Sequence, residues 1–201
     1  MKGALGIGAV ILGLLVIFGI FAFGQYNSLV GVEEDVNKAW ANVESDYQRR
    51  YDLIDNLVAT VDNAAEFERG TLTDVIEARS RAQSVQLSVD ELTPENIQRF
   101  QQAQNELNQS FLGRMSFLQE NYPQLTATQQ FRDLMSQIEG TENRINVSRN
   151  RYNDAVQVYN TKVRTAPTNI VAGLFGFERK APFSSVQGAE VAPSVRDSFN
   201  R

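Results

Sequence analysis

Three charged side chains lie on stripes of apolar residues, where they could do chemistry or fix how helices pack. Arg50 interrupts one stripe, and Glu142 and Arg149 interrupt another, two helical turns apart. A buried charge without a partner is very unfavourable, so we expect Arg50 or Arg149 to pair with Glu142. Such a cluster could bind a ligand or take part in proton transfer. It could also be a structural polar lock that fixes helix register, which is the interpretation we favour.

Tyrosines and a run of acids are the other groups that could form a site. Four tyrosines recur at helical spacing: Tyr47, Tyr51, Tyr152 and Tyr159. Tyrosine at such spacing more often lies in a core or at its rim than in a cofactor site. The acidic run at residues 33–35 could attract a metal. We interpret it as a solvated or oligomer-facing surface.

The composition excludes several kinds of chemistry. The 201 residues include no histidine and no cysteine, which removes the commonest general base and metal ligand and any thiolate nucleophile or disulfide. The net charge of −5 and the isoelectric point near 4.9 argue against a nucleic-acid surface. The sequence also lacks phosphate-binding and nucleophile-elbow motifs. We therefore expect no catalytic residues, no cofactor, no metal and no nucleic-acid partner.

A charge-free apolar run covers residues 4–24. About 20 apolar residues in a helix span the hydrocarbon core of a bilayer, so this run predicts a transmembrane anchor. A cleaved signal peptide is the alternative, because the small residues Ala22 and Gly24 resemble a cleavage site. Lys2 favours a cytoplasmic N-terminus with the following domain outside or periplasmic, by the positive-inside rule.

Four helices are expected after the anchor, over residues 27–65, 68–86, 94–120 and from a cap at Thr126 or Thr128 to 165. The first stripe comprises Leu29, Val36, Trp40, Val43, Tyr47, Arg50, Ile54, Leu57 and Val61. The second comprises Leu72, Val75, Ile76 and Ala82, and the third comprises Ile97, Phe100, Leu107, Phe111, Met115 and Leu118. The fourth comprises Phe131, Met135, Ile138, Glu142, Ile145, Arg149, Tyr152, Val156, Tyr159 and Val163. The alternating four- and three-residue steps indicate seams that pack against other helices.

A short apolar segment follows Pro167 and carries Ile170, Leu174, Phe175 and Phe177. It is too short to span a bilayer. In an up-down bundle the last long helix returns toward the anchor, so this segment would end near the membrane. We expect it to contact the membrane interface or another copy of the chain, and capping of the bundle core is the alternative.

Several short segments of the sequence resemble motifs of the LemA family. They are YNSLV at 26–30, QRRYDLIDNLV at 48–58, EAR at 77–79, NYP at 121–123, GTENRI at 140–145 and RYNDAV at 151–156. The resemblance covers residues 1–180. It implies a bacterial inner-membrane or cytoplasmic-membrane protein with a helical-bundle domain and no established activity. The resemblance also implies a relationship to a group of LemA-like proteins that is associated with magnetosome membrane formation.

We therefore expect an all-α fold, with an N-terminal transmembrane helix followed by an elongated antiparallel four-helix bundle. The expected parts are an anchor over 1–25, a LemA-like bundle over 26–168, an apolar membrane-proximal segment over 169–180 and a flexible tail over 181–201. The expected location is the bacterial inner membrane, with a single pass.

The leading functional hypothesis is a non-enzymatic, membrane-anchored scaffold that self-assembles and organises or shapes the membrane. Its partners would be the lipid bilayer and further copies of the chain. The first alternative is an adaptor that binds another membrane protein, such as a protease or a signalling complex. The second is an enzyme that uses carboxylates and tyrosines.

Overall fold

The computed structural model describes residues 2–63 and 72–184, with side chains described from Ile11 on. The elements are α1 (Lys2–Asp62), α2 (Thr73–Ser84), the 3₁₀ helix η1 (Val89–Glu91), α3 (Pro94–Asn121), α4 (Pro123–Thr126), α5 (Gln129–Arg164) and α6 (Thr168–Phe175). No strand occurs in this part of the chain. The expected all-helical fold is thus confirmed.

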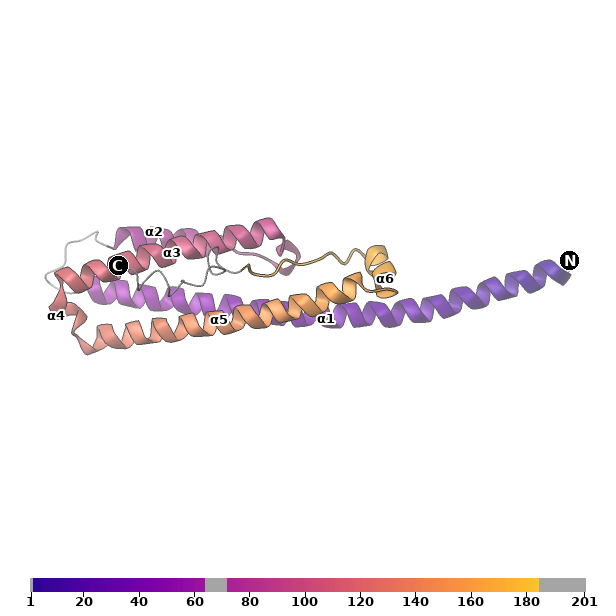
Figure 1. The fold of residues 1–201 in the computed structure, drawn as a ribbon, viewed down its shortest axis with the longest axis horizontal. Coiled ribbons are helices and arrows are strands. Elements are labelled where there is room, and N and C mark those ends of the chain that lie inside the picture. The colour runs from indigo at the N-terminus through magenta and orange to yellow at the C-terminus, as the bar shows by residue number, and fades with distance from the viewer. Residues whose placement is uncertain (1, 64–71, 185–201) are drawn as a thin grey trace, which may run out of the picture.

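The N-terminal helix α1 is one continuous element of 61 residues, about 90 Å long, that extends well beyond the other helices (Figure 1). Within the described residues, it is the one helix long and apolar enough to cross a membrane. Its apolar side chains from Ile11 to Phe23 face outward. The later part of α1 buries every residue of the stripe that the sequence predicts, from Leu29 to Val61. The helix therefore passes from an apolar surface into a packed core without a break.

Helices α1 and α5 run antiparallel and lie side by side over most of α5 (Figure 1). Side-chain hydrogen bonds mark the register along the pair: Gln130 to Thr60, Arg50 to Glu142, Ser148 to Asp46, and Lys162 to Ser28. Residue numbers rise along α5 as they fall along α1, which establishes the antiparallel direction. The end of α5 consequently lies beside the end of the apolar segment of α1.

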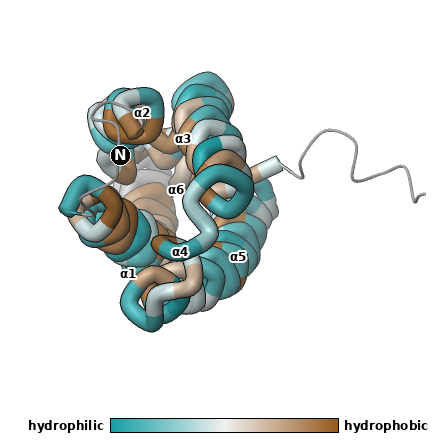
Figure 2. The backbone as a smooth tube through the Cα atoms, turned by 90° about the vertical axis from the view of Figure 1, so that its left-hand side faces the viewer, coloured by the Kyte–Doolittle hydropathy of each residue, from teal (hydrophilic) through white to brown (hydrophobic). Residues whose placement is uncertain are grey.

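Helices α2 and α3 pack on each other and close the core from the other side. Figure 2 shows α1, α2, α3 and α5 end-on around a common interior. Trp40 of α1 is 2% exposed, and its indole Nε1 donates to the Leu87 carbonyl at 3.0 Å. Thr93 caps α3 and Pro94 is its first residue, as the sequence predicts, and Thr128 caps α5.

Some details of the sequence prediction are wrong. Ile76 is 45% exposed, because α2 buries Val75, Ala78 and Ala82 at helical spacing and Ile76 lies about 100° around the helix from Val75, outside that buried stripe. The expected start of this helix at residue 68 lies outside the described residues, and α2 begins at Thr73. The loop expected at 87–93 contains η1, which is closed by a capping box between Ser88 and Glu91.

Candidate functional site

A buried polar cluster lies at the centre of the helical core. Arg50, which is 4% exposed, donates from Nη1 to Glu142 Oε1 at 2.9 Å and from Nη2 to Gln104 Oε1 at 2.5 Å. Gln104 Nε2 in turn donates to the Tyr51 hydroxyl at 2.5 Å. The guanidinium also lies 5.1 Å from the centroid of the Tyr47 ring. One guanidinium therefore joins α1, α3 and α5.

The electrostatics of this cluster suit a structural contact. Desolvation raises the pKa of Tyr51 and of Tyr47, so both phenols stay neutral in the physiological range. The cavity beside Arg50 and Glu142 has a volume of about 10 Å³, room for about one water molecule at most. Arg50 Nε is a buried donor without a partner among the described residues. The cluster can hold three helices in register, but it has no room for a substrate.

Arg149 does not belong to this cluster. It lies two turns beyond Glu142, about 10 Å farther along the axis of α5. Its guanidinium covers the Phe183 ring at 4.6 Å, and Nη2 donates to the Ser184 carbonyl at 3.5 Å. Of the two arginines that could pair with Glu142, the structure pairs Arg50.

Sequence reasoning missed Gln104, which supplies both an acceptor for Arg50 and a donor to Tyr51. Gln104 is 4% exposed and lies four residues after Phe100 and three before Leu107. That spacing places Gln104 on the buried stripe of α3. A polar residue on an apolar stripe indicates a buried hydrogen-bonding group, so the sequence pattern alone could have identified it.

A second candidate site lies where α6 packs against α1, next to the outward-facing apolar side chains. Val171 and Ala172 of α6 form a small apolar cluster with Leu29. Thr168 Oγ1 donates to Gln25 Oε1 at 2.7 Å. The ring of Tyr26 lies 4.9 Å from that of Phe175. These contacts hold α6 beside residues 25–29 of α1. Figure 1 shows α6 next to α1, near the end of α5.

The four predicted contact residues of this segment divide into two groups. Ile170, Leu174 and Phe175 are 56%, 66% and 57% exposed. Phe177 is half-buried and packs edge-on against Tyr26, with ring centroids 5.7 Å apart. Ile170, Leu174 and Phe175 form an exposed apolar surface, and the Phe175 ring also contacts Tyr26. Phe177 belongs to the contact between α6 and α1.

The segment after α6, residues 177–184, is a strap that lies along the bundle, and it was missed by the sequence analysis. Lys180 is 8% exposed and pairs with Glu33 at 3.0 Å, so Glu33 is not simply solvated. Phe183, 5% exposed, packs between Trp40, Phe100 and Tyr152. Residues 181–184 were expected to begin a flexible tail, but these aromatic contacts hold them on the core. Residues 185–201 of that expected tail lie outside the described residues.

Comparison with known proteins identifies the family of this chain. The family model described as the LemA family matches residues 39–196. The chain belongs to the LemA family. It is 25% identical to Protein LemA of Metamycoplasma hominis over 165 residues, which cover 81% of this chain and 71% of that protein. It is also 25% identical to Magnetosome protein MamQ 2 and to Magnetosome protein MamQ 1 of Paramagnetospirillum magneticum, over 176 residues each. Those residues cover 79% of this chain and 64% of each MamQ protein, so the chain spans less than two thirds of their length.

The LemA match contains the cluster around Arg50, the helix α6 and the strap. The apolar segment of α1 lies outside it, and so do Gln25, Tyr26 and Leu29, which form the α1 side of the second site. Among the described residues, no group of three acidic, histidine or cysteine side chains is placed to hold a metal ion. The family-matched part of the chain is a helical body that carries a part-buried ion pair between Arg50 and Glu142, an exposed apolar face on α6 and the strap.

Proposed function

We propose that this LemA-family chain is a non-enzymatic scaffold, anchored by α1 in the bacterial cytoplasmic membrane, that self-assembles and organises the bilayer. In this proposal α1, α2, α3 and α5 form an antiparallel four-helix bundle that serves as a rigid body. The N-terminus is cytoplasmic and the bundle lies outside. The cluster of Arg50, Gln104 and Glu142 acts as a lock on helix register.

The observation that carries the proposal is the position of the exposed face of α6 relative to the apolar part of α1. The charge-free run ends at Gly24, and α6 contacts α1 from Gln25 to Leu29. At 1.5 Å per residue these contacts lie within about 8 Å of the end of the run. The headgroup layer on each side of the hydrocarbon core is about 5–8 Å thick. Ile170, Leu174 and Phe175 would thus face the lipid interface.

The exposed apolar face also supports assembly. Each exposed phenylalanine or leucine can gain about 1.5–3 kcal/mol on full burial, which is a weak contact for one copy. Many copies side by side would multiply such contacts through avidity. The likeness to two proteins named as magnetosome proteins is compatible with a role at a shaped membrane.

The test places a nitroxide label on the face of α6. The chain has no native cysteine, so Phe175→Cys labels one site, and Val158→Cys on the exposed face of α5 is the matched control. In vesicles the label at 175 should be more accessible to oxygen than to a water-soluble nickel chelate, with the reverse at 158. If the labels at 175 and 158 are equally accessible to the nickel chelate, α6 does not contact the membrane and this part of the proposal is wrong.

Size analysis of the detergent-extracted full chain tests self-assembly. A defined homo-oligomer supports the scaffold.

The second candidate function is an adaptor. The observation that favours it is an open groove of about 880 Å³, lined on one side by polar side chains of α3 and on the other by α5 and the strap. A monomer that copurifies with one membrane protein would favour that adaptor over the scaffold.

A further inference from the structure

The strap is bound through its backbone, and the spacing of its helical partners matches the spacing of that backbone. Asn160 Nδ2 donates to the Lys180 carbonyl at 2.8 Å, and Asn160 Oδ1 accepts from the Lys180 amide at 3.0 Å. Asn153 makes the same two contacts with the backbone of Phe183, at 3.2 and 2.8 Å. Seven helical residues rise about 10.5 Å, and three extended residues span about 10 Å. Side-chain amides on one helix face thus bind an extended segment at regular intervals.

The last described residue of the strap is held between α3 and α5. Gln101 Nε2 of α3 donates to the Ser184 carbonyl at 3.1 Å, and the Ser184 hydroxyl donates to Gln101 Oε1 at 3.0 Å. From α5, Arg149 Nη2 donates to the same carbonyl at 3.5 Å. The Ala181 amide contacts the Leu92 carbonyl, so the strap runs in the same direction as the chain from Leu92 to Gln101. The strap therefore ends between the two helices, directed along α3.

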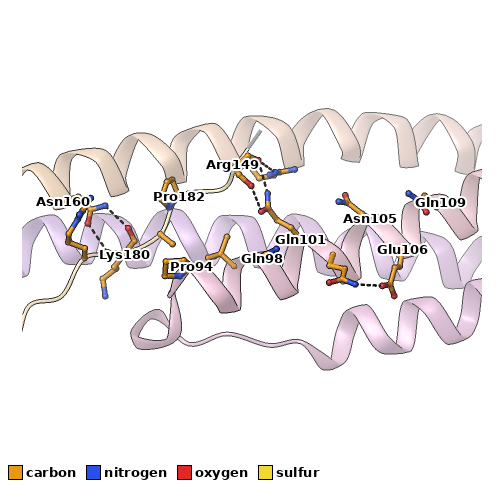
Figure 3. A pocket seen from close by; sticks show the side chains of 15 residues that line it. Pro94, Gln98, Gln101, Asn105, Glu106, Gln109, Arg149, Asn160, Lys180 and Pro182 are labelled. Atoms are coloured by element: carbon orange, nitrogen blue, oxygen red, sulfur yellow. Dashed lines mark hydrogen bonds between the residues drawn. The ribbon is translucent and has the colours of Figure 1, made fainter. Parts of the chain in front are cut away.

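The groove continues along α3 past this point. Its volume is about 880 Å³, and Figure 3 shows Gln101, Asn105 and Gln109 one after another on its α3 wall. Asn105 and Gln109 are exposed and have no hydrogen-bond partner among the described residues. Neighbouring amides of this row are four residues apart, which is a rise of about 6 Å, and two extended residues span about 6.6 Å. The α3 wall can therefore bind an extended backbone at every second residue.

The residues that follow Ser184 in the sequence suit this wall. Residues 185–189, here called the extension, read Ser-Val-Gln-Gly-Ala and carry no charged side chain. Glu106 also lines the groove, so its carboxylate would repel an acidic segment but not an uncharged one. The LemA family match continues to residue 196 and so includes the extension. Because the extension is joined to a strap that is already bound, its effective concentration at the groove is at least on the order of millimolar.

We propose that the extension continues the strap along the groove, with its backbone bound by the side-chain amides of Asn105 and Gln109. Counting two residues per amide from the contact of Gln101 with Ser184, Asn105 binds Val186 and Gln109 binds Gly188. The groove is then a site for an extended, uncharged peptide, and its resident ligand is this chain itself. A partner protein would reach the groove only by displacing the extension. This inference does not depend on self-assembly.

The test measures cross-linking within the full-length chain in membranes. The chain has no native cysteine, so Gln109→Cys together with Gln187→Cys gives a short bis-maleimide reagent one defined pair. The matched control pairs Gln187→Cys with Arg144→Cys, at an exposed position of α5. Position 144 lies about 7.5 Å farther along the groove than Arg149 and faces about 140° away from it around α5. The first pair should form the intramolecular product severalfold faster than the control pair.

Two outcomes of this experiment would overturn the proposal. Equal rates for the two pairs would mean that the extension is not docked, because an undocked extension reaches both positions alike. A product that joins two copies, in place of the intramolecular product, would mean that the groove holds the extension of a second copy. Neither outcome would affect the membrane-anchored scaffold, which rests on α1 and α6.

Hydrogen exchange gives a second measurement on the full chain without introduced cysteines. The amides of the extension should exchange about tenfold more slowly than those of an open chain. Replacing both Asn105 and Gln109 with alanine should remove this protection while Lys180 and Phe183 remain protected. Asn108→Ala, at an exposed position of α3 outside the groove lining, is the control and should leave the protection unchanged. Protection that persists in the double variant would contradict binding by these two amides.

Discussion

Phe183 stacks on Trp40, with ring centroids 5.9 Å apart and ring planes 22° apart. The strap thus completes the aromatic core around the single tryptophan of the chain. The two residues lie at opposite ends of the folded sequence, so neither local propensity nor periodicity joins them.

We predict that Phe183→Ala lowers the free energy of unfolding by about 2–4 kcal/mol, because it opens a cavity beside Trp40. It should also shift the Trp40 fluorescence emission to longer wavelength as water enters. Denaturant unfolding followed by this fluorescence measures both effects. Pro182→Ala, at an exposed neighbouring position, is the control and should change neither quantity appreciably.

Glu142→Ala should destabilise the protein by about 1–3 kcal/mol, because it leaves the buried guanidinium of Arg50 with one fewer acceptor. The effect falls short of that for a fully buried pair, since the Glu142 side chain is 36% exposed. Glu142→Gln keeps an acceptor oxygen and should cost less. Thermal unfolding measures the difference, with exposed Arg49→Ala as control. An unchanged melting temperature in Glu142→Ala would show that the ion pair contributes no net stability.

Phe175→Ser and Phe177→Ser should behave differently, although only Gly176 lies between the two positions. Phe175 is 57% exposed and its ring contacts Tyr26, so its replacement should leave helicity unchanged and lower the melting temperature less than Phe177→Ser does, while weakening membrane engagement or assembly. Phe177 packs against Tyr26 and joins the apolar cluster around Leu29, so its replacement should lower the melting temperature. Circular dichroism and oligomer size, measured on the full chain, separate the two effects. Equal losses of stability would place both rings in the core.

Leu14→Arg should reduce membrane association, because a charge near the centre of a spanning helix costs about 2.5–3.5 kcal/mol on insertion. The measurement is the fraction of the chain recovered with membranes. Val158→Arg adds the same charge to an exposed apolar position of α5 and should leave that fraction unchanged. Undiminished recovery of the Leu14→Arg variant would argue against a spanning role for the apolar segment.

Alkaline pH should destabilise the fold through its buried tyrosines. Burial raises the pKa of Tyr152 and of Tyr159 above the ordinary value of 10.0, so the folded state holds these protons more tightly than the unfolded state. Their contribution to stability is full below pH 10 and is lost as the pH rises toward the folded-state pKa. Tyr152→Phe should therefore flatten the fall of melting temperature above pH 10. An identical fall in wild type and variant would show that another group controls the alkaline transition.

The sequence by itself determined the helices and the residues that face the core. Every residue of the predicted stripe of α1 is buried, and so is every residue of the stripe of α3. Both follow from steps of three and four residues, which local helical geometry imposes. The caps at Thr93 and Thr128 are equally local, because a hydroxyl reaches the backbone amide three residues later. The apolar run at 4–24 could be recognised for the same reason, since length and polarity decide whether a helix can span a bilayer.

The tertiary structure alone decided which polar groups meet. Periodicity placed Arg50, Glu142 and Arg149 on buried stripes, but the register between α1 and α5 determines that Arg50 is the partner of Glu142. The strap was beyond the reach of pattern analysis. Residues 177–184 have no periodic pattern, and they are held by Asn153, Asn160 and Trp40, which come together only after the helices have packed. Periodicity reports the face of one element, whereas a groove is made by several elements, and its shape exists only in the folded chain.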